Sequence, residues 1–378
     1  MGRTLVSLDI GGSGVRAIQF TPGRNGPVVE KVAVATLPTG VVVAGEIRDP
    51  AAVSLALKEL WSREKLKTKK VVFSLANSHV LVRQMDLEWL APDDFRKSLK
   101  YQAAEYIPMD INEVTVDYHA LKDFETVDPV TGQTRRMLQI LLVVASNETL
   151  DGFVTALRGA GLQPVRAEIS PFALVRAANP APGSESAEPS VEVLLELGAH
   201  VANLVIHEGG QPRYVRIMTG QGGEVLTQVL RDRFEWSHEE AERTKIALGM
   251  PTSHPAGAAL GVSDTVFGGV ATATVPGDEH PAQTVINESV SRLIGEVRQT
   301  VDFFLTSGSN IGSLSRVVLS GGGGNLGGFA QRLASELRVP VEFGNPLDHV
   351  PNSRKVRVPE GVTPQELSIA LGLAMGAN

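Results

Sequence analysis

The N-terminal segment combines an acidic residue, a run of small residues and an arginine in a pattern suited to phosphate chemistry. Glycines let backbone N–H groups approach an anion, and a carboxylate beside them can hold Mg²⁺ through water. The arginine would add positive charge. A glycine-rich hairpin turn without a ligand is the alternative interpretation of the same residues. The residues concerned are Asp9, Gly11, Gly12, Ser13, Gly14 and Arg16.

The glycine spacing also permits a dinucleotide-binding motif, at Gly12, Gly14 and Ala17. Glycine loops of that kind open a helix, whereas residues 15–20 alternate as a strand does and precede a polar turn. We therefore reject this motif. The pattern predicts a β-hairpin from residues 5–10 and 15–20, with a third strand at 28–35.

The second half of the chain repeats this arrangement about half the chain length later. Residues 193–198 form an apolar stretch that contains an acid and ends in a glycine, and strands are predicted at 201–207 and 214–218. Two such turns that face each other across a cleft would clamp the β- and γ-phosphates of a nucleotide. The second turn consists of Glu196, Gly198, Ala199 and His200, with Glu196 as the counterpart of Asp9 in holding Mg²⁺ through water.

Two further segments fit the rest of a nucleotide. Residues 316–320 predict a strand that runs into four glycines, whose backbone would lie flat against a purine base; a flexible turn is the alternative. The residues chosen there are Gly321, Gly322, Gly323 and Asn325. Glu242 and Lys245 lie one helical turn apart, where they would reach ribose hydroxyls or form a solvated ion pair.

Size and composition exclude several classes of protein. The chain has 378 residues, which suits two domains, and a formal net charge of −7, which argues against non-specific nucleic-acid binding. It has no cysteine, so disulfides and thiolate sites are excluded. No run of about 18 apolar residues is present, and we expect no direct membrane insertion.

The chain divides at a polar Pro/Ser-rich segment. We expect a first domain at residues 1–178, a linker at 179–190 and a second domain at 191–378 with an outer subdomain at about 222–292. A low-complexity stretch at 251–277 predicts a surface loop. Further helices are predicted at 51–64, 92–106 and 150–159, and further strands at 69–75, 114–121 and 137–145.

In this order the four motifs resemble those of the actin-like ATPase superfamily, which includes actin, Hsp70, sugar kinases and FtsA. The resemblance implies an α/β, duplicated actin-like (ribonuclease H-like) two-domain fold. A more specific resemblance, over nearly the whole chain, is to the PilM family of type IV pilus assembly proteins. It is carried by residues 8–20, 101–109, 113–121, 141–146, 160–164, 169–174, 240–245 and 296–302. It implies an extra subdomain of the FtsA/PilM type at about 80–165.

The resemblance to PilM also implies a function. It indicates an ATP-binding cytoplasmic scaffold of a type IV pilus or related secretion system, with ATP and Mg²⁺ as cofactors. The implied partner is a PilN-like single-pass membrane protein, whose N-terminal peptide docks in a groove near residues 83–87 and 95–106; a pilus motor ATPase is a further candidate. The scaffold would lie at the inner membrane through these partners.

Two departures from the superfamily pattern concern catalysis. The second phosphate motif usually begins with Asp, where this chain has Glu196, and the Glu-Pro pair of Hsp70-like enzymes corresponds to Ser170-Pro171. Glu168 lies nearby as the candidate general base. We expect nucleotide binding with weak or absent hydrolysis.

Two alternatives to the scaffold stay open. One is a sugar or acyl-phosphate kinase, with Asp117 or Asp86 as its base. The other is an FtsA-like filament former, although residues 367–378 lack the basic amphipathic helix that would anchor it to a membrane.

Overall fold

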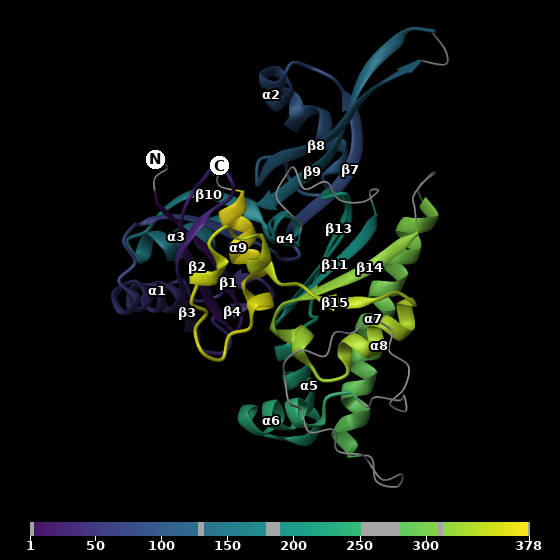
Figure 1. Ribbon diagram of the computed structural model, residues 1–378. Helices are drawn as coiled ribbons and strands as arrows, with labels where there is room; N and C mark the ends of the chain where they lie inside the picture. The colour runs from purple at the N-terminus through teal and green to yellow at the C-terminus, as the bar shows by residue number, and fades with distance from the viewer. Residues whose placement is uncertain (1–3, 128–131, 179–189, 251–279, 308–312, 377–378) are drawn as a thin grey trace.

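The computed structural model describes residues 4–127, 132–178, 190–250, 280–307 and 313–376 (Figure 1). Nearly all of the expected linker at 179–190 and the whole predicted surface loop at 251–277 lie outside these ranges. None of the helices in the described part of the chain is both long and apolar enough to cross a bilayer.

The first sheet is built around the predicted hairpin. Its strands are β1 (Leu5–Gly11), β2 (Gly14–Thr21), β3 (Val28–Thr36), β6 (Lys70–Leu75) and β10 (Gln163–Ile169), in the order β10-β6-β1-β2-β3. β1 and β2 are antiparallel, with Asp9 opposite Arg16, so the rejection of a dinucleotide-binding loop is confirmed. Helices α1 (Pro50–Glu64) and α3 (Asn147–Gly159) share this sheet's core, and the ribbon β4 (Val42–Val43) and β5 (Glu46–Ile47) lies nearby.

The second sheet repeats the first. Its strands are β11 (Val191–Leu197), β12 (Val201–Glu208), β13 (Gln211–Thr219), β14 (Leu314–Ser320) and β15 (Val341–Phe343), in the order β13-β12-β11-β14-β15. In each sheet the central strand pairs with an antiparallel hairpin on one side and with a parallel strand on the other. Its helices are α5 (Gly223–Phe234), α6 (His238–Leu248), α7 (Pro281–Ser307) and α8 (Phe329–Leu337). The predicted duplication is therefore present.

A separate small layer lies between β6 and α3 in the chain. It contains β7 (Val80–Glu88), helix α2 (Pro92–Ala103) with a 3₁₀ turn at Ala104–Tyr106, β8 (Val114–Val127) and β9 (Thr134–Ser146), in the sheet order β7-β9-β8. Its own core forms around Phe95, whose ring lies 4.7 Å from that of Tyr118. The expected boundaries of 80–165 need correction, because α3 and β10 pack with the first sheet.

The C-terminal segment returns to the first half, which corrects the expected second domain at 191–378. Helix α9 (Ser368–Met375) packs against α4 (Ser170–Ala178) and β1, after 3₁₀ turns at Pro346–His349, Ser353–Lys355 and Pro364–Leu367. The two helices touch at Gly372, where a Cβ atom would lie 1.8 Å from the Ala173 carbonyl oxygen. A polar linker is visible in a sequence, but the return of an apolar helix to a distant sheet is not.

Candidate functional site

A cavity of about 640 Å³ lies between the two sheets, a size typical of small-molecule sites. Both hairpin turns and both segments predicted to hold the nucleoside line it. Of the predicted site residues, it brings together Asp9, Gly11, Gly12, Ser13, Arg16, Glu196, Gly198, Ala199, His200, Glu242, Lys245, Gly321, Gly322, Gly323 and Asn325.

Gly14 is not among the lining residues. It pairs with Gly11 to close the hairpin and has a φ of +150°. A Cβ atom there would lie 2.2 Å from the Ala35 carbonyl oxygen on the neighbouring strand β3. Its role in the structure is therefore to let the turn form.

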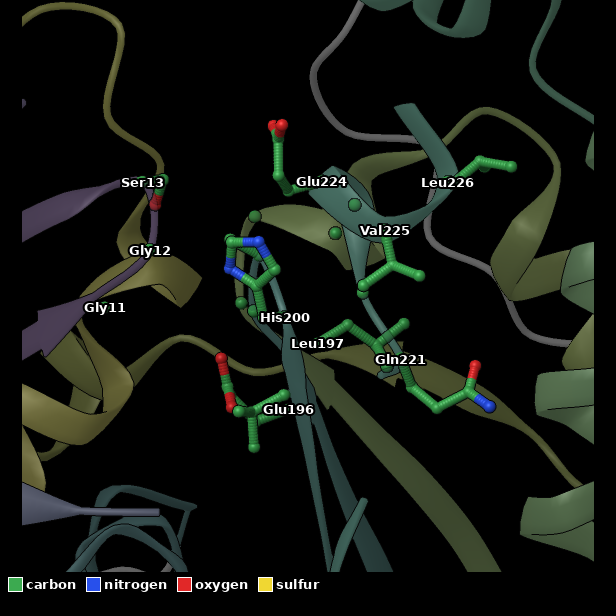
Figure 2. Close-up of a pocket in the computed structure, with 18 of the residues that line it drawn as sticks. Gly11, Gly12, Ser13, Glu196, Leu197, His200, Gln221, Glu224, Val225 and Leu226 are labelled. Carbon is green, nitrogen blue, oxygen red and sulfur yellow. The ribbon is translucent and has the colours of Figure 1, made fainter. Parts of the chain in front are cut away.

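The tips of the two hairpins meet inside the cavity. A Cβ atom on Gly12 would lie 2.3 Å from Nδ1 of His200, so the imidazole packs directly on the glycine backbone (Figure 2). Burial lowers the pKa of His200, which favours the neutral ring. Its buried Nδ1 has no hydrogen-bond partner among the described residues. A ligand between the tips would supply that partner.

The contact between the tips makes a testable prediction for stability. Gly12→Ala forces the His200 ring to move, and the Val42 carbonyl oxygen at 3.1 Å from the added methyl leaves little room. We expect a loss of about 1–3 kcal/mol, the usual cost of overpacking, measured by urea unfolding without ligand. Gly11→Ala is the matched control, because nothing lies within 4 Å of its added Cβ. Equal losses in both variants would contradict the contact.

Two carboxyl groups, those of Asp9 and Glu196, line the cavity. Burial raises the pKa of Asp9, and the charge of Arg16 partly opposes this. Burial raises the pKa of Glu196 to about 8, although Asn203 Nδ2 donates a 2.7 Å hydrogen bond to it; the nearby Asp9 raises it further. The surroundings of both groups stabilise the ionised carboxylate poorly. A bound cation would favour the ionised forms.

These residues fit a largely hydrated Mg²⁺. No group of three or more acidic or histidine side chains with metal-site geometry occurs in the described part of the chain. Two carboxylates alone leave most positions to water and phosphate oxygens, which is how Mg²⁺ is commonly bound beside nucleotides. Asp9 and Glu196 would hold the ion from opposite walls.

Arg16 is held by a residue that the sequence did not reveal. Its Nη2 atom lies 3.1 Å from Glu366 Oε2, and both terminal nitrogens lie 3.3 Å from Ser13 Oγ. Glu366 belongs to the C-terminal 3₁₀ turn Pro364–Leu367, where it also accepts hydrogen bonds from Thr363. The arginine therefore ties the first phosphate loop to the returning C-terminal segment.

The N-terminus of α5 supports the second hairpin turn, residues 198–200. Sequence patterns did not predict this support. Gly223 N donates to Gly198 O at 3.0 Å and Glu224 N donates to Ala199 O at 2.9 Å. The first-turn amides of α5 are therefore occupied by loop carbonyls. In Figure 2 the side chain of Glu224 extends away from the His200 ring, and His238 Nε2 lies 3.0 Å from its carboxylate.

The Glu242–Lys245 pair lies in the cavity wall and is not a solvated surface pair. Lys245 is 7% exposed, and its Nζ donates to Glu242 Oε2 at 2.6 Å, Thr227 Oγ1 at 2.8 Å and Gly223 O at 2.9 Å. This lysine fixes α6 to the start of α5. Glu242 keeps a place in the lining, where it can accept a hydrogen bond from a ligand hydroxyl.

The glycine run after β14 forms a close-fitting wall. Gly321 has a φ of +79°, and a Cβ atom there would lie 2.3 Å from Leu197 O and 2.6 Å from Glu196 Oε1. Residues Gly322–Asn325 form a 3₁₀ turn, and Asn325 Oδ1 accepts a 2.8 Å hydrogen bond from Gln365. The side chain-free surface suits the flat face of a base.

Glu168 lies outside the cavity lining. Its carboxylate bonds to Arg176 and lies 3.5 Å from Arg166, in an ion-pair cluster beside α9. The structure therefore does not bring it to the position that a general base would need. Asp86 and Asp117 are exposed on the three-stranded sheet and are also absent from the lining, which removes the support for a kinase.

The duplicated sheets and the cavity between them define an actin-like ATPase fold. Solved structures with this fold include the ethanolamine utilization protein EutJ from Carboxydothermus hydrogenoformans (TM-score 0.53, 14% identity, covering 99% of this chain and 90% of that one). They also include MreB 5 of Spiroplasma citri bound to AMPPNP (TM-score 0.53, 12% identity, covering 98% and 95%).

Within that class the chain belongs to the PilM family. The family model described as type IV pilus assembly protein PilM matches residues 7–257 and 277–378. A solved PilM–PilN type IV pilus biogenesis complex is similar over 98% of this chain and 97% of that chain, with 26% identity and a TM-score of 0.75.

Proposed function

We propose that this protein is an ATP-binding scaffold of a type IV pilus assembly platform that docks the cytoplasmic N-terminal peptide of a PilN-like inner-membrane protein. The observation that carries the proposal is the similarity to the PilM–PilN complex over nearly the full length of both chains. The partner would hold the scaffold at the cytoplasmic face of the inner membrane. Co-purification with a PilN-like protein, and its loss when the N-terminal peptide of that protein is deleted, is the direct test.

ATP with Mg²⁺ is the ligand that the cavity fits best. The structure of the distant relative MreB 5 contains AMPPNP, and here two glycine turns, two carboxyl groups and a glycine wall surround one cavity. Asp9 and Glu196 would hold the metal, which would neutralise charge on the phosphates. Gly12, Ser13 and His200 would contact the phosphates. With Glu168 engaged by arginines, we propose binding with little hydrolysis.

The peptide site is proposed to lie along β7 and the end of α2. Strand-like capture of a peptide uses the open edge of a sheet together with side-chain contacts, and β7 is an edge strand of the three-stranded sheet. Beside it, the Arg83 guanidinium lies 5.5 Å from the centre of the Tyr106 ring. Tyrosine and arginine are frequent hot-spot residues at interfaces.

Tyr106→Ala is therefore expected to weaken binding of the PilN-like peptide by roughly tenfold, the loss of about 1.4 kcal/mol. Fluorescence anisotropy with a labelled peptide would measure the change. Tyr101→Ala is the control, because Tyr101 lies on α2 just before the turn that carries Tyr106, is 84% exposed, and makes no contact with Arg83 comparable to that of Tyr106. A larger effect at Tyr101 than at Tyr106 would place the peptide elsewhere.

A further inference from the structure

Basic side chains gather where several strands of the first sheet begin, at the end of the sheet opposite the cavity. β1 and β6 begin at this edge, since Val6 pairs with Val71, and β10 begins there too, since Gln163 pairs with Lys70. The turn from β2 to β3 also lies at this edge, because Leu5 pairs with Phe20. We call the following residues the basic edge: Arg24, Lys65, Lys67, Lys69, Lys70 and Arg158.

The basic edge is not neutralised by the described residues around it. Glu64, the acidic residue of the same segment, is already engaged by Lys31 at 3.3 Å and by Arg63 at 3.1 Å. No ion pair within the described ranges involves a member of the basic edge, and all six side chains are exposed or half-buried. A chain with a net charge of −7 therefore carries a local excess of positive charge.

We propose that the basic edge contacts an anionic phospholipid surface. Four of its members are lysines, which act as hydrated point charges on flexible stems and suit the diffuse potential of a headgroup layer. Lys65, Lys67 and Lys69 fall within the short connection between α1 and β6, and Lys70 begins β6. Val165, 51% exposed on β10, adds an apolar side chain near them. A site for a discrete anion would require a pocket. None of these residues lines the cavity between the sheets or the small hollow beside α4 and β14.

The position of the basic edge agrees with the proposed function, and the proposed contact with a membrane rests partly on that function. In Figure 1 the three-stranded sheet, beside which the partner peptide is proposed to bind, lies in the upper part of the view, as does the end of β10 nearest the chain termini. The partner would supply the anchor, and the basic edge would orient the scaffold on the membrane.

Vesicle sedimentation without the partner tests the proposal. We expect the full-length protein to bind vesicles of 40% phosphatidylglycerol and 60% phosphatidylcholine at low salt, and to be released at 0.5 M NaCl, where screening is strong. The K65Q/K67Q/K69Q variant should bind at least tenfold more weakly. The matched control is R233Q/R243Q/K355Q, which removes the same charge from exposed residues away from both the basic edge and the three-stranded sheet.

Three results would overturn the proposal. They are equal binding to pure phosphatidylcholine, equal binding by the two triple variants, or binding of the basic edge to polyuridylic acid or polyglutamate but not to the anionic vesicles. The last result would assign the edge to RNA or to an acidic protein. Failure of the partner peptide to bind would instead contradict the proposed function and leave the vesicle result unaffected.

Discussion

Replacing Asp9 with alanine is expected to abolish the rise in melting temperature that ATP and Mg²⁺ give the wild-type protein. A ligand at a hundred times its dissociation constant stabilises the folded state by about 2.7 kcal/mol, which corresponds to a shift of several degrees in Tm. Asp9 lines the cavity together with Glu196 and is close enough to raise the pKa of that carboxyl group. Its removal takes away one of the two carboxylates proposed to hold the metal.

The comparison must be made within each variant, with and without nucleotide. Asp9 is half-buried and its pKa is raised, so alanine can itself stabilise the empty protein. Asp86→Ala is the control, because this exposed carboxylate lies on β7, away from the cavity lining. The absence of any shift in the wild type at millimolar ATP would end the nucleotide proposal. A full shift in Asp9→Ala would instead remove this residue from the metal site.

The sequence predicted the two hairpin turns that line the cavity because their signals are local. An alternating pattern broken by glycines specifies a hairpin within about ten residues, and the repeat of that pattern at Glu196 implies a symmetric partner. The contact between Gly12 and His200 follows from that symmetry. Local chemistry was also sufficient to place the glycine run after β14 in the cavity wall.

The parts that sequence patterns missed depend on contacts between distant residues. Glu366 reaches Arg16 only because α9 returns to the first sheet, and the start of α5 bonds to the Gly198–His200 loop through backbone amides that no side chain identifies. Glu168 failed for the same reason. It lies close in the chain to Ser170-Pro171, where the superfamily pattern has its Glu-Pro pair. In the structure, however, Arg166 and Arg176 hold it in an ion-pair cluster.

Glu196→Gln is expected to flatten the pH dependence of stability in the nucleotide-free protein. Burial raises the pKa of Glu196 from 4.5 to about 8, so between these values the folded carboxyl keeps a proton that the unfolded chain has released. The folded state then binds more protons than the unfolded state, and the free energy of unfolding falls as pH rises through this window. At 1.36 kcal/mol per pKa unit, the total loss has an upper limit of about 5 kcal/mol.

Urea unfolding from pH 5 to pH 8.5 would measure this slope. Glutamine keeps the shape and can still accept the Asn203 hydrogen bond, but it cannot ionise, so the variant should be the more stable protein at pH 8.5. Part of the slope should persist, since burial raises the pKa of Asp9 as well. Glu59→Gln, at an exposed position on α1, serves as the control.

Adding ATP and Mg²⁺ separates the two roles of Glu196. A cation between the carboxylates favours their ionised forms, so saturating ligand should reduce the loss of stability at high pH in the wild type. The glutamine variant should gain less from the ligand at pH 8.5. If its slope and its response to ligand both match those of the wild type, then Glu196 neither carries the buried proton nor faces the metal. The cavity would then bind its ligand through the glycine turns alone.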